Sequence, residues 1–315
     1  MRRNTQGYAL AGRRVLLTGA AGAFGSATAA ALRERGAAVA GLDIAAAGPD
    51  AGFDGDGDAR HGVFPCDITD DAQVSARVPE AVDRLGGLDA LVHLAGVGEP
   101  VDAGARPGSE VHRTLEVNLL GPWRVTAAAL PELVRSRGRL VFVASELAYA
   151  VLPFAAAYAV SKRGLTAYAD VVRLEYGTHV AVTTVYPGYV RTPIHDASLA
   201  AGLSLEGQVR RERVDDIVAT VLRVLAARRP PRDVAATRLG GIELWLARHL
   251  PAAVERVIRA RVARDLRRYV DVPLARGLVR RYGERNGVGV ARGADAPLLT
   301  GPSEPEGGQP HGPDA

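Results

Sequence analysis

The chain has 315 residues, of which 47% are hydrophobic, enough for the core of one large α/β domain or two ordinary ones. Its single cysteine, Cys66, excludes an internal disulfide, and the N-terminus has no long apolar run, so we expect a cytoplasmic protein without signal peptide or transmembrane span. The formal net charge of +4 conceals a basic stretch, 206–285, with 19 arginines against 10 acidic residues. Neither zinc-ligand spacing nor interleaved aromatic residues accompany the arginines, which argues against a nucleic-acid partner.

Strands and helices alternate along the first 190 residues, a pattern typical of a parallel sheet covered by helices on both faces. Short apolar runs predict the strands, and longer amphipathic runs predict the helices. The expected strands are 13–18, 37–43, 63–67, 88–96, 139–145 and 180–186, and the expected helices are 24–35, 70–85, 109–136 and 157–176. The sequence therefore predicts an α/β fold with a doubly wound parallel sheet of Rossmann type, formed as a single domain with a C-terminal helical extension.

Four segments follow from this pattern. We expect an N-terminal arm (1–11), a catalytic domain (12–240), a basic helical extension (241–290) and a disordered tail (291–315) rich in glycine and proline. Within the loop 45–62, the residues Asp54, Asp56 and Asp58 mimic the first ligands of a calcium loop. The sixth and twelfth positions are Ala59 and Pro65 instead of glycine and glutamate, so no metal site is expected.

A glycine-rich turn separates the first strand from the first helix. Gly19, Gly22 and Gly25 stand with Ala23 and Phe24 where a backbone can approach a pyrophosphate at a helix N-terminus. Glycines of this kind also suit a tight turn or close packing. Here, however, Asp43 closes the second strand 24 residues after Gly19, and a carboxylate there can bind both hydroxyls of an adenosine ribose. The combination predicts a dinucleotide site.

A second group of residues joins a strand end to a helix start. Tyr158 and Lys162 are four residues apart and therefore lie on one helix face, while Ser145 ends the strand 139–145. Lys162 is the only lysine in a chain that otherwise uses arginine, and its ammonium is a compact point charge. The alternative is a surface lysine beside a packed tyrosine. We interpret the three residues as a candidate catalytic group.

Over residues 12–235 the chain resembles the short-chain dehydrogenases/reductases. The resemblance rests on TGAAGAFG at 18–25, Asp43, 66–68, 94–96, Asn118, Ser145, Tyr158 with Lys162, and 187–192. Ala23 in the glycine turn and His93-Leu94-Ala95-Gly96 are closer to the extended subgroup of nucleotide-sugar epimerases. The spacing from Ser145 to Tyr158 and the presence of Asn118 are closer to the classical subgroup, and we give them more weight because they concern the catalytic half.

The resemblance implies a catalytic tetrad of Asn118, Ser145, Tyr158 and Lys162. Tyr158 would be the acid/base, with its pKa lowered by Lys162 and by the nicotinamide charge, and Ser145 would hold the substrate oxygen. Lys162 would also bind the nicotinamide ribose, and Asn118 would hold a water that links the lysine to solvent. His93 is expected to replace a structural asparagine that ties neighbouring strands together. The implied coenzyme-binding residues are Gly19, Gly22, Ala23, Phe24, Gly25, Asp43, Asp67, Ile68, Ala95, Gly96, Tyr158, Lys162, Pro187, Gly188, Val190 and Thr192.

The same resemblance implies hydride transfer between NAD(H) and a secondary alcohol or ketone by a homo-oligomeric enzyme. NAD is preferred over NADP because Asp43 would repel a 2′-phosphate and no basic residue stands nearby in the sequence. The alternatives are an epimerase or dehydratase on the same fold, and a dinucleotide sensor without chemistry. A largely apolar substrate is expected from the residues that fall where relatives line their substrate pocket: Leu147, Leu152, Phe154, Tyr189, Ile194 and Leu199.

Beyond the resemblance, Pro251 opens a basic amphipathic helix. Its apolar residues recur every three or four positions at Val254, Val257, Ile258, Val262, Leu266 and Tyr269, with arginines between them. Such a helix packs on its own domain or a second subunit, or lies on an anionic membrane through residues 251–270. We favour packing, because Trp245 and Leu250 extend the apolar face.

Overall fold

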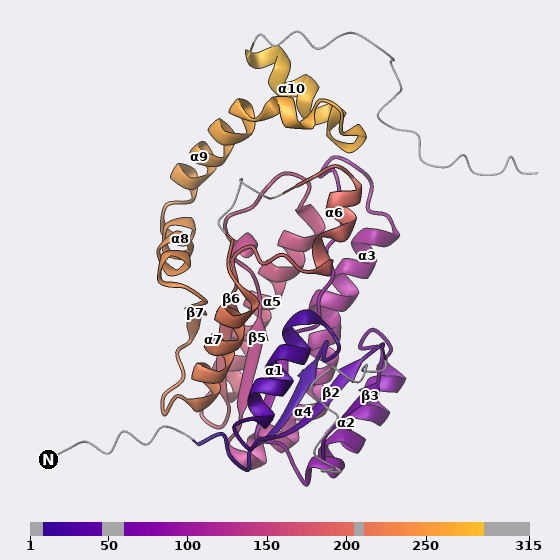
Figure 1. The fold of residues 1–315 in the computed structure, drawn as a ribbon, viewed down its shortest axis with the longest axis vertical. Helices are drawn as coiled ribbons and strands as arrows, with labels where there is room; N and C mark the ends of the chain where they lie inside the picture. Colours follow the sequence, from indigo (N-terminus) through magenta and orange to yellow (C-terminus); the bar gives the residue numbers. More distant parts are fainter. Residues whose placement is uncertain (1–8, 46–59, 205–210, 287–315) are drawn as a thin grey trace, which may run out of the picture.

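The computed structural model describes residues 9–45, 60–204 and 211–286 and contains a parallel sheet with helices on both faces (Figure 1). Within these residues the sheet has seven strands in the order β3-β2-β1-β4-β5-β6-β7, which confirms the predicted doubly wound architecture. The candidate calcium loop and the predicted tail lie outside the described residues. The strands are β1 (Arg14–Thr18), β2 (Ala38–Asp43), β3 (Gly62–Pro65), β4 (Ala90–His93), β5 (Arg139–Val143), β6 (Ala181–Tyr186) and β7 (Asp233–Ala235).

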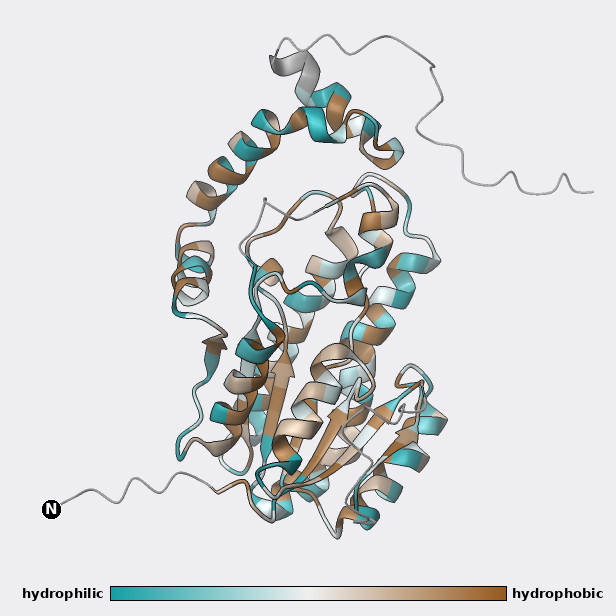
Figure 2. Ribbon diagram, viewed as in Figure 1, coloured by the Kyte–Doolittle hydropathy of each residue, from teal (hydrophilic) through white to brown (hydrophobic). Residues whose placement is uncertain are grey.

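Two apolar clusters hold the helices against the sheet. Successive residues of a strand point to opposite faces, so Val15 and Leu17 of β1 belong to one cluster and Leu16 to the other. Figure 2 accordingly shows apolar central strands and helices with one polar side. Helices α1 (Ala23–Arg33) and α7 (Val214–Ala226) cover one face, and α2 (Asp71–Leu85), α4 (Gly121–Ser136) and α5 (Ala156–Tyr176) cover the other.

The predicted helix 109–136 is interrupted. It consists of α3 (Ser109–Leu115), a π-helical turn (Glu116–Leu120) and α4. In a continuous α-helix the N–H of residue 122 would donate to the carbonyl of Asn118, but Pro122 has no N–H. Pro122 thus favours the wider π-helical turn, and this turn contains the candidate site residue Asn118.

The last strand was not predicted. β7 has only three residues and pairs with β6 through Thr184, Val185 and Tyr186, so its place in the sheet depends on a long-range contact rather than on its own composition.

After β7 the chain leaves the sheet and passes over its carboxyl edge, as Figure 1 shows. This part, residues 238–282, is called the C-terminal arch below. It contains α8 (Arg238–His249), α9 (Pro251–Arg264), the turns Leu266–Tyr269 and Pro273–Ala275, and the start of α10 (Arg276–Asn286). The helix predicted from Pro251 thus ends at Arg264, before two of its predicted apolar positions. No helix in the described part of the chain is both long and apolar enough to cross a membrane.

Candidate active site

The carboxyl ends of the central strands border a cavity of about 620 Å³. It lies where β1 and β4 are neighbours and the strand order reverses, the position at which open α/β sheets bind ligands. Its walls come from the glycine turn after β1, from residues 143–147 at the end of β5, and from the segment after β6. These are the loops that carry the predicted site residues.

At Gly19, Gly22 and Gly25 the backbone itself lines the cavity, without a side chain. Gly19 has a φ of +68°, and a Cβ there would lie 2.6 Å from the Cα of Ala95. At Gly25 a Cβ would lie 2.1 Å from the carbonyl oxygen of Gly19. Side chains are therefore excluded, and α1 begins directly after Gly22 with a helix N-terminus of the kind that binds phosphate. The turn fits the pyrophosphate of a dinucleotide.

Asp43, at the end of β2, lies against the same turn. One oxygen of its carboxylate accepts a hydrogen bond from the Ala21 N–H, and the other accepts one from the Ala45 N–H, both at 2.9 Å. Asp67 accepts hydrogen bonds from the Thr69 N–H and hydroxyl, and Ile68 is buried against Gly121. Asp43, Asp67 and Ile68 stand outside the cavity lining, as does Ala95, which packs against the core.

Ser145, Tyr158 and Lys162 meet at the cavity wall. Ser145 follows β5, and its hydroxyl accepts a hydrogen bond from the Leu147 N–H at 3.2 Å and is hydrogen-bonded to Tyr158. The Lys162 Nζ lies 5.7 Å from the centre of the Tyr158 ring and donates to the Val143 carbonyl at 3.1 Å. α5 thus holds an ammonium one turn away from a phenol that already contacts a serine.

Burial shifts both ionisable groups away from their charged forms. It raises the pKa of Tyr158 to about 12, although the hydrogen bond with Ser145 acts in the opposite direction, and it lowers the pKa of Lys162 to about 8. In the protein chain alone the pKa of Tyr158 is therefore raised, and the lowered pKa expected with oxidised coenzyme stays a prediction. The loss of solvent around the phenol outweighs the effect of its neighbours.

Asn118 is fully buried in the π-helical turn. Its amide donates to the Val97 carbonyl at 2.8 Å and to the Ser161 hydroxyl at 3.0 Å, and its oxygen accepts from the Val97 N–H at 2.8 Å. A Cβ on Gly96 would lie 3.5 Å from both the Asn118 oxygen and the Lys162 Nζ, so the amide is next to the lysine. Its side chain fixes the segment after β4, and does not line the cavity.

His93 is a structural residue. It is 1% exposed, stacks on Phe142 with 5.0 Å between ring centres, and its Nε2 lies 2.9 Å from the Thr126 hydroxyl of α4. The side chain therefore contacts the neighbouring strand β5 through Phe142 and helix α4 through Thr126, in keeping with the expected structural role. Burial, together with the charge of Lys162, lowers the pKa of His93 to about 3, so the ring stays neutral.

The segment after β6 forms the remaining wall of the cavity. Its backbone is fixed on Glu212, whose carboxylate accepts from the Gly188 N–H at 2.8 Å. A second, smaller cavity of about 80 Å³ lies beside Tyr158 and includes Phe154. Leu199 is 38% exposed and lines neither cavity. Other predicted residues in the lining of the larger cavity are Ala23, Phe24, Gly96, Leu147, Leu152, Pro187, Gly188, Tyr189, Val190, Thr192 and Ile194.

The structure adds residues that no sequence pattern indicated. Glu212 is buried, and a Cβ on Gly188 would lie 3.3 Å from an oxygen of Glu212 and from one of Glu146. Glu146 directly follows Ser145 in the sequence, whereas Glu212 lies in a distant part of the chain, so the sequence does not show that the two carboxylates are neighbours. The arch also lines the larger cavity. The recurrence of apolar residues every three or four positions was the one sequence signal that indicated an apolar helix face there.

The doubly wound sheet, the glycine turn and the Ser145–Tyr158–Lys162 group define a dinucleotide-binding protein of Rossmann type. A family model described as short chain dehydrogenase matches residues 13–201. The chain belongs to the short-chain dehydrogenase/reductase family.

Its relatives include named dehydrogenases. The chain is 33% identical over 192 residues to the D-threitol dehydrogenase of Mycolicibacterium smegmatis, covering 59% of this chain and 74% of that protein. It is 30% identical over 228 residues to the L-fucose dehydrogenase of Mus musculus, covering 71% and 80%. A 3-ketoacyl-(acyl-carrier-protein) reductase from Brucella melitensis, solved with NADH, matches with a TM-score of 0.63 and 25% identity over 72% of this chain and 96% of that one.

Proposed function

We propose that the protein is an oxidoreductase that transfers a hydride between NAD(H) and a secondary alcohol or ketone. The contact between Tyr158 and Ser145, beside Lys162 and opposite the glycine turn, carries this proposal. A sensor would need the glycine turn but not a half-buried phenol hydrogen-bonded to a serine. The named dehydrogenases among the relatives support the same reaction class.

The coenzyme supplies or accepts the hydride at the carbinol carbon. In the direction of reduction, Ser145 hydrogen-bonds the carbonyl oxygen and Tyr158 donates its proton to that oxygen, which gives the alcohol and a phenolate. A pKa of about 12 keeps Tyr158 protonated at neutral pH, so that the phenol has a proton to donate. In the direction of oxidation the phenol must lose its proton first, and the positive charge on Lys162 favours the phenolate that results.

The preference for NAD rests on Asp43. Its carboxylate lies against the glycine turn, where an adenosine ribose would bind and where a 2′-phosphate would meet a second negative charge. The turn itself offers only Ala20, Ala21 and Ala23, and Asp43 is followed by Ile44 and Ala45. Among the described residues next to Asp43 in the turn and strand end there is thus no cation to bind a phosphate.

The experiment is a screen of alcohols and ketones followed by nicotinamide absorbance, with Tyr158→Phe as the test variant. We expect the variant to lose nearly all turnover and to keep binding NADH, because only the proton path is removed. Tyr168→Phe is the matched control: it lies on the same helix, stacks on Trp123 away from the cavity, and should keep its turnover. Tyr158→Phe with wild-type turnover would refute the proposal. A wild type that converts substrate without net coenzyme turnover would indicate an epimerase or dehydratase.

A further inference from the structure

The outer wall of the large cavity is made by the C-terminal arch. Side chains at the end of α8, at Leu250 between the two helices and along one side of α9 line the cavity. Those of α9 recur at steps of three and four residues, about one turn of helix at a time, and form a stripe. All of these residues but the last are apolar: Leu246, Leu250, Ala253, Val254, Val257, Ile258 and Arg261. From Val254 to Arg261 the wall extends about 10 Å along α9.

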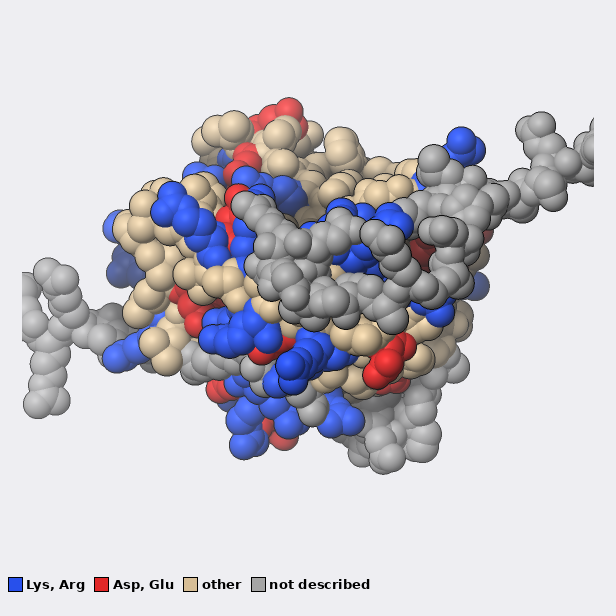
Figure 3. All heavy atoms as spheres, turned by 90° about the horizontal axis from the view of Figure 1, so that it is seen from above, with Lys and Arg blue, Asp and Glu red and all other residues tan. Residues whose placement is uncertain are grey.

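The two sides of α9 differ in chemistry. Val254 and Ile258 are half-buried on the cavity side, and Val262 is buried, whereas Arg256 and Arg259 are exposed. Figure 3, seen from above, shows basic side chains spread over this end of the molecule. The apolar side of the helix thus borders the cavity, with Val254 and Ile258 half-buried and Val257 58% exposed. Trp245 does not line the cavity; it stacks on His249 and is 54% exposed.

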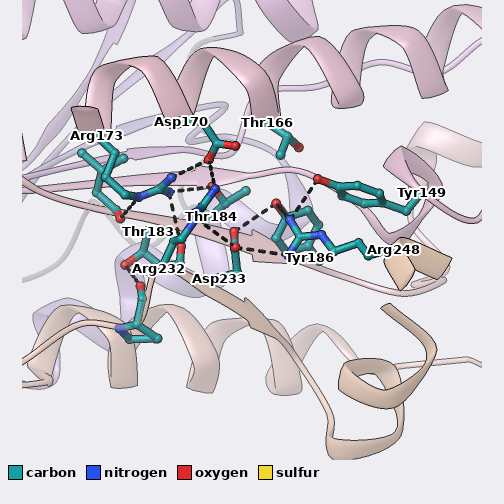
Figure 4. A network of polar contacts seen from close by, with 12 residues as sticks. Tyr149, Thr166, Asp170, Arg173, Thr183, Thr184, Tyr186, Arg232, Asp233 and Arg248 are labelled. Atoms are coloured by element: carbon teal, nitrogen blue, oxygen red, sulfur yellow. Dashed lines mark hydrogen bonds and ion pairs between the residues drawn. The ribbon is translucent and has the colours of Figure 1, made fainter. Parts of the chain in front are cut away.

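The beginning of the arch is fixed to the catalytic domain by Arg248. Its guanidinium donates to Asp233 at 3.1 Å, to the Tyr186 hydroxyl at 2.7 Å and to the Tyr149 hydroxyl at 3.0 Å (Figure 4). It also lies over the rings of Tyr149 and Tyr186, 4.4 and 4.9 Å from their centres. Tyr149 follows the turn that Ser145 begins, so α8 is held against the segment that carries the catalytic serine.

The far end of the arch is fixed beside the small cavity. Tyr269 lines that cavity and packs near Phe154, with 6.3 Å between ring centres, in a cluster with Leu203, Leu266 and Val272. Phe154 has a φ of +64°, a strained conformation for an aromatic residue that persists only when its surroundings hold it. The arch is therefore anchored at both ends, through Arg248 and through Tyr269, and its middle, α9, borders the large cavity.

We infer that the arch is the wall of a subsite for an apolar chain, so that the substrate is an alcohol or ketone with a long apolar tail. This inference rests on the proposed function and adds the substrate class. The reacting carbon would lie at Tyr158, and the tail would pass between Leu147 and Leu152 on one side and the stripe of α9 on the other. A small sugar or a short ketone would leave this apolar surface uncovered.

The test compares acetone with methyl nonyl ketone, using NADH and the full-length enzyme. For the wild type, kcat/KM should be about a hundredfold higher for the long ketone, as expected when several methylene groups enter an apolar pocket. Val254→Asp should reduce the ratio of the two kcat/KM values about tenfold or more, because a charge then faces the tail. Val270→Asp is the matched control, since it is 51% exposed in the same arch and lines neither cavity. Its ratio should equal that of the wild type.

A second variant tests the inference independently of whether Val254→Asp folds. Val254→Trp fills the subsite without introducing charge, and should move the preferred chain length towards shorter ketones. Equal kcat/KM values for the two ketones in the wild type, or an unchanged ratio in both Val254 variants, would overturn the inference while leaving the proposed function intact. A wild type that reduces no ketone with either coenzyme would overturn the proposed function, and this inference with it.

Discussion

Replacing Lys162 by methionine should abolish turnover and change how stability depends on pH. The ammonium is 4% exposed, and burial lowers its pKa from 10.5 to about 8. The unfolded chain therefore binds more protons than the native protein between pH 8 and 10.5, and this group makes the native state more stable as the pH rises through that window. At pH 7 the charged lysine costs the native state about 3 kcal/mol, and at pH 10 less than about 1 kcal/mol.

Methionine has similar length and no charge, so Lys162→Met removes this penalty at both pH values. It also removes the hydrogen bond to the Val143 carbonyl, and the difference between the charged and the neutral donor at the two pH values is already contained in the pKa of Lys162. The free energy of unfolding of the variant, relative to that of the wild type, should thus be larger at pH 7 than at pH 10 by roughly 2 to 3 kcal/mol. Urea denaturation at the two pH values measures this difference. Arg77→Met is the control, because a guanidinium keeps its charge throughout and its relative stability should not change. A relative stability of Lys162→Met that is equal at pH 7 and pH 10 would refute the burial penalty.

Two further predictions concern the coenzyme site. The wild type should have a kcat/KM at least about tenfold higher with NAD than with NADP, since two anions at close range repel by more than about 1 kcal/mol. Asp43→Ala should reduce the ratio of the two kcat/KM values. A wild type with a higher kcat/KM for NADP would contradict the role proposed for Asp43. Gly25→Ala should abolish NADH binding, measured by fluorescence titration, and lower stability by at least about 2 kcal/mol because its Cβ would overlap the Gly19 backbone. Gly241→Ala, whose nearest neighbour would lie 4.0 Å away, should change stability by less than about 1 kcal/mol, and an equal effect of the two substitutions would rule out the steric explanation.

The parts of the fold that were predictable are those whose cause is local. The buried strands are continuous apolar runs, the glycine turn stands between a strand and a helix, and Tyr158 with Lys162 is a helical spacing. β7 was missed because its pairing depends on β6, which lies far away in the chain. The raised pKa of Tyr158 in the protein chain alone was not predicted, for a related reason. Spacing in the sequence shows that a lysine is near, but it does not show how much solvent the surrounding elements remove.

The arch was partly predictable. Its amphipathic pattern correctly indicated a helix with one apolar side, but what that side covers depends on Arg248 and Tyr269, whose partners are up to 115 residues earlier in the chain, as in the pairing of Tyr269 with Phe154. Its helix also ends at Arg264, earlier than the apolar recurrence indicated, because the turn Leu266–Tyr269 seats Tyr269 beside the small cavity.

The only lysine of the chain is buried at the candidate active site, which matters for reagents that react with amines. Amine-directed crosslinkers, which normally sample a protein's surface, would find no lysine side chain there, and only the α-amino group would compete with Lys162. Amine labelling thus becomes a local probe: the extent of modification of one peptide reports how often the interior of the site opens to solvent. The same feature allows a fluorophore or an affinity label to be directed to the site without first replacing any other lysine.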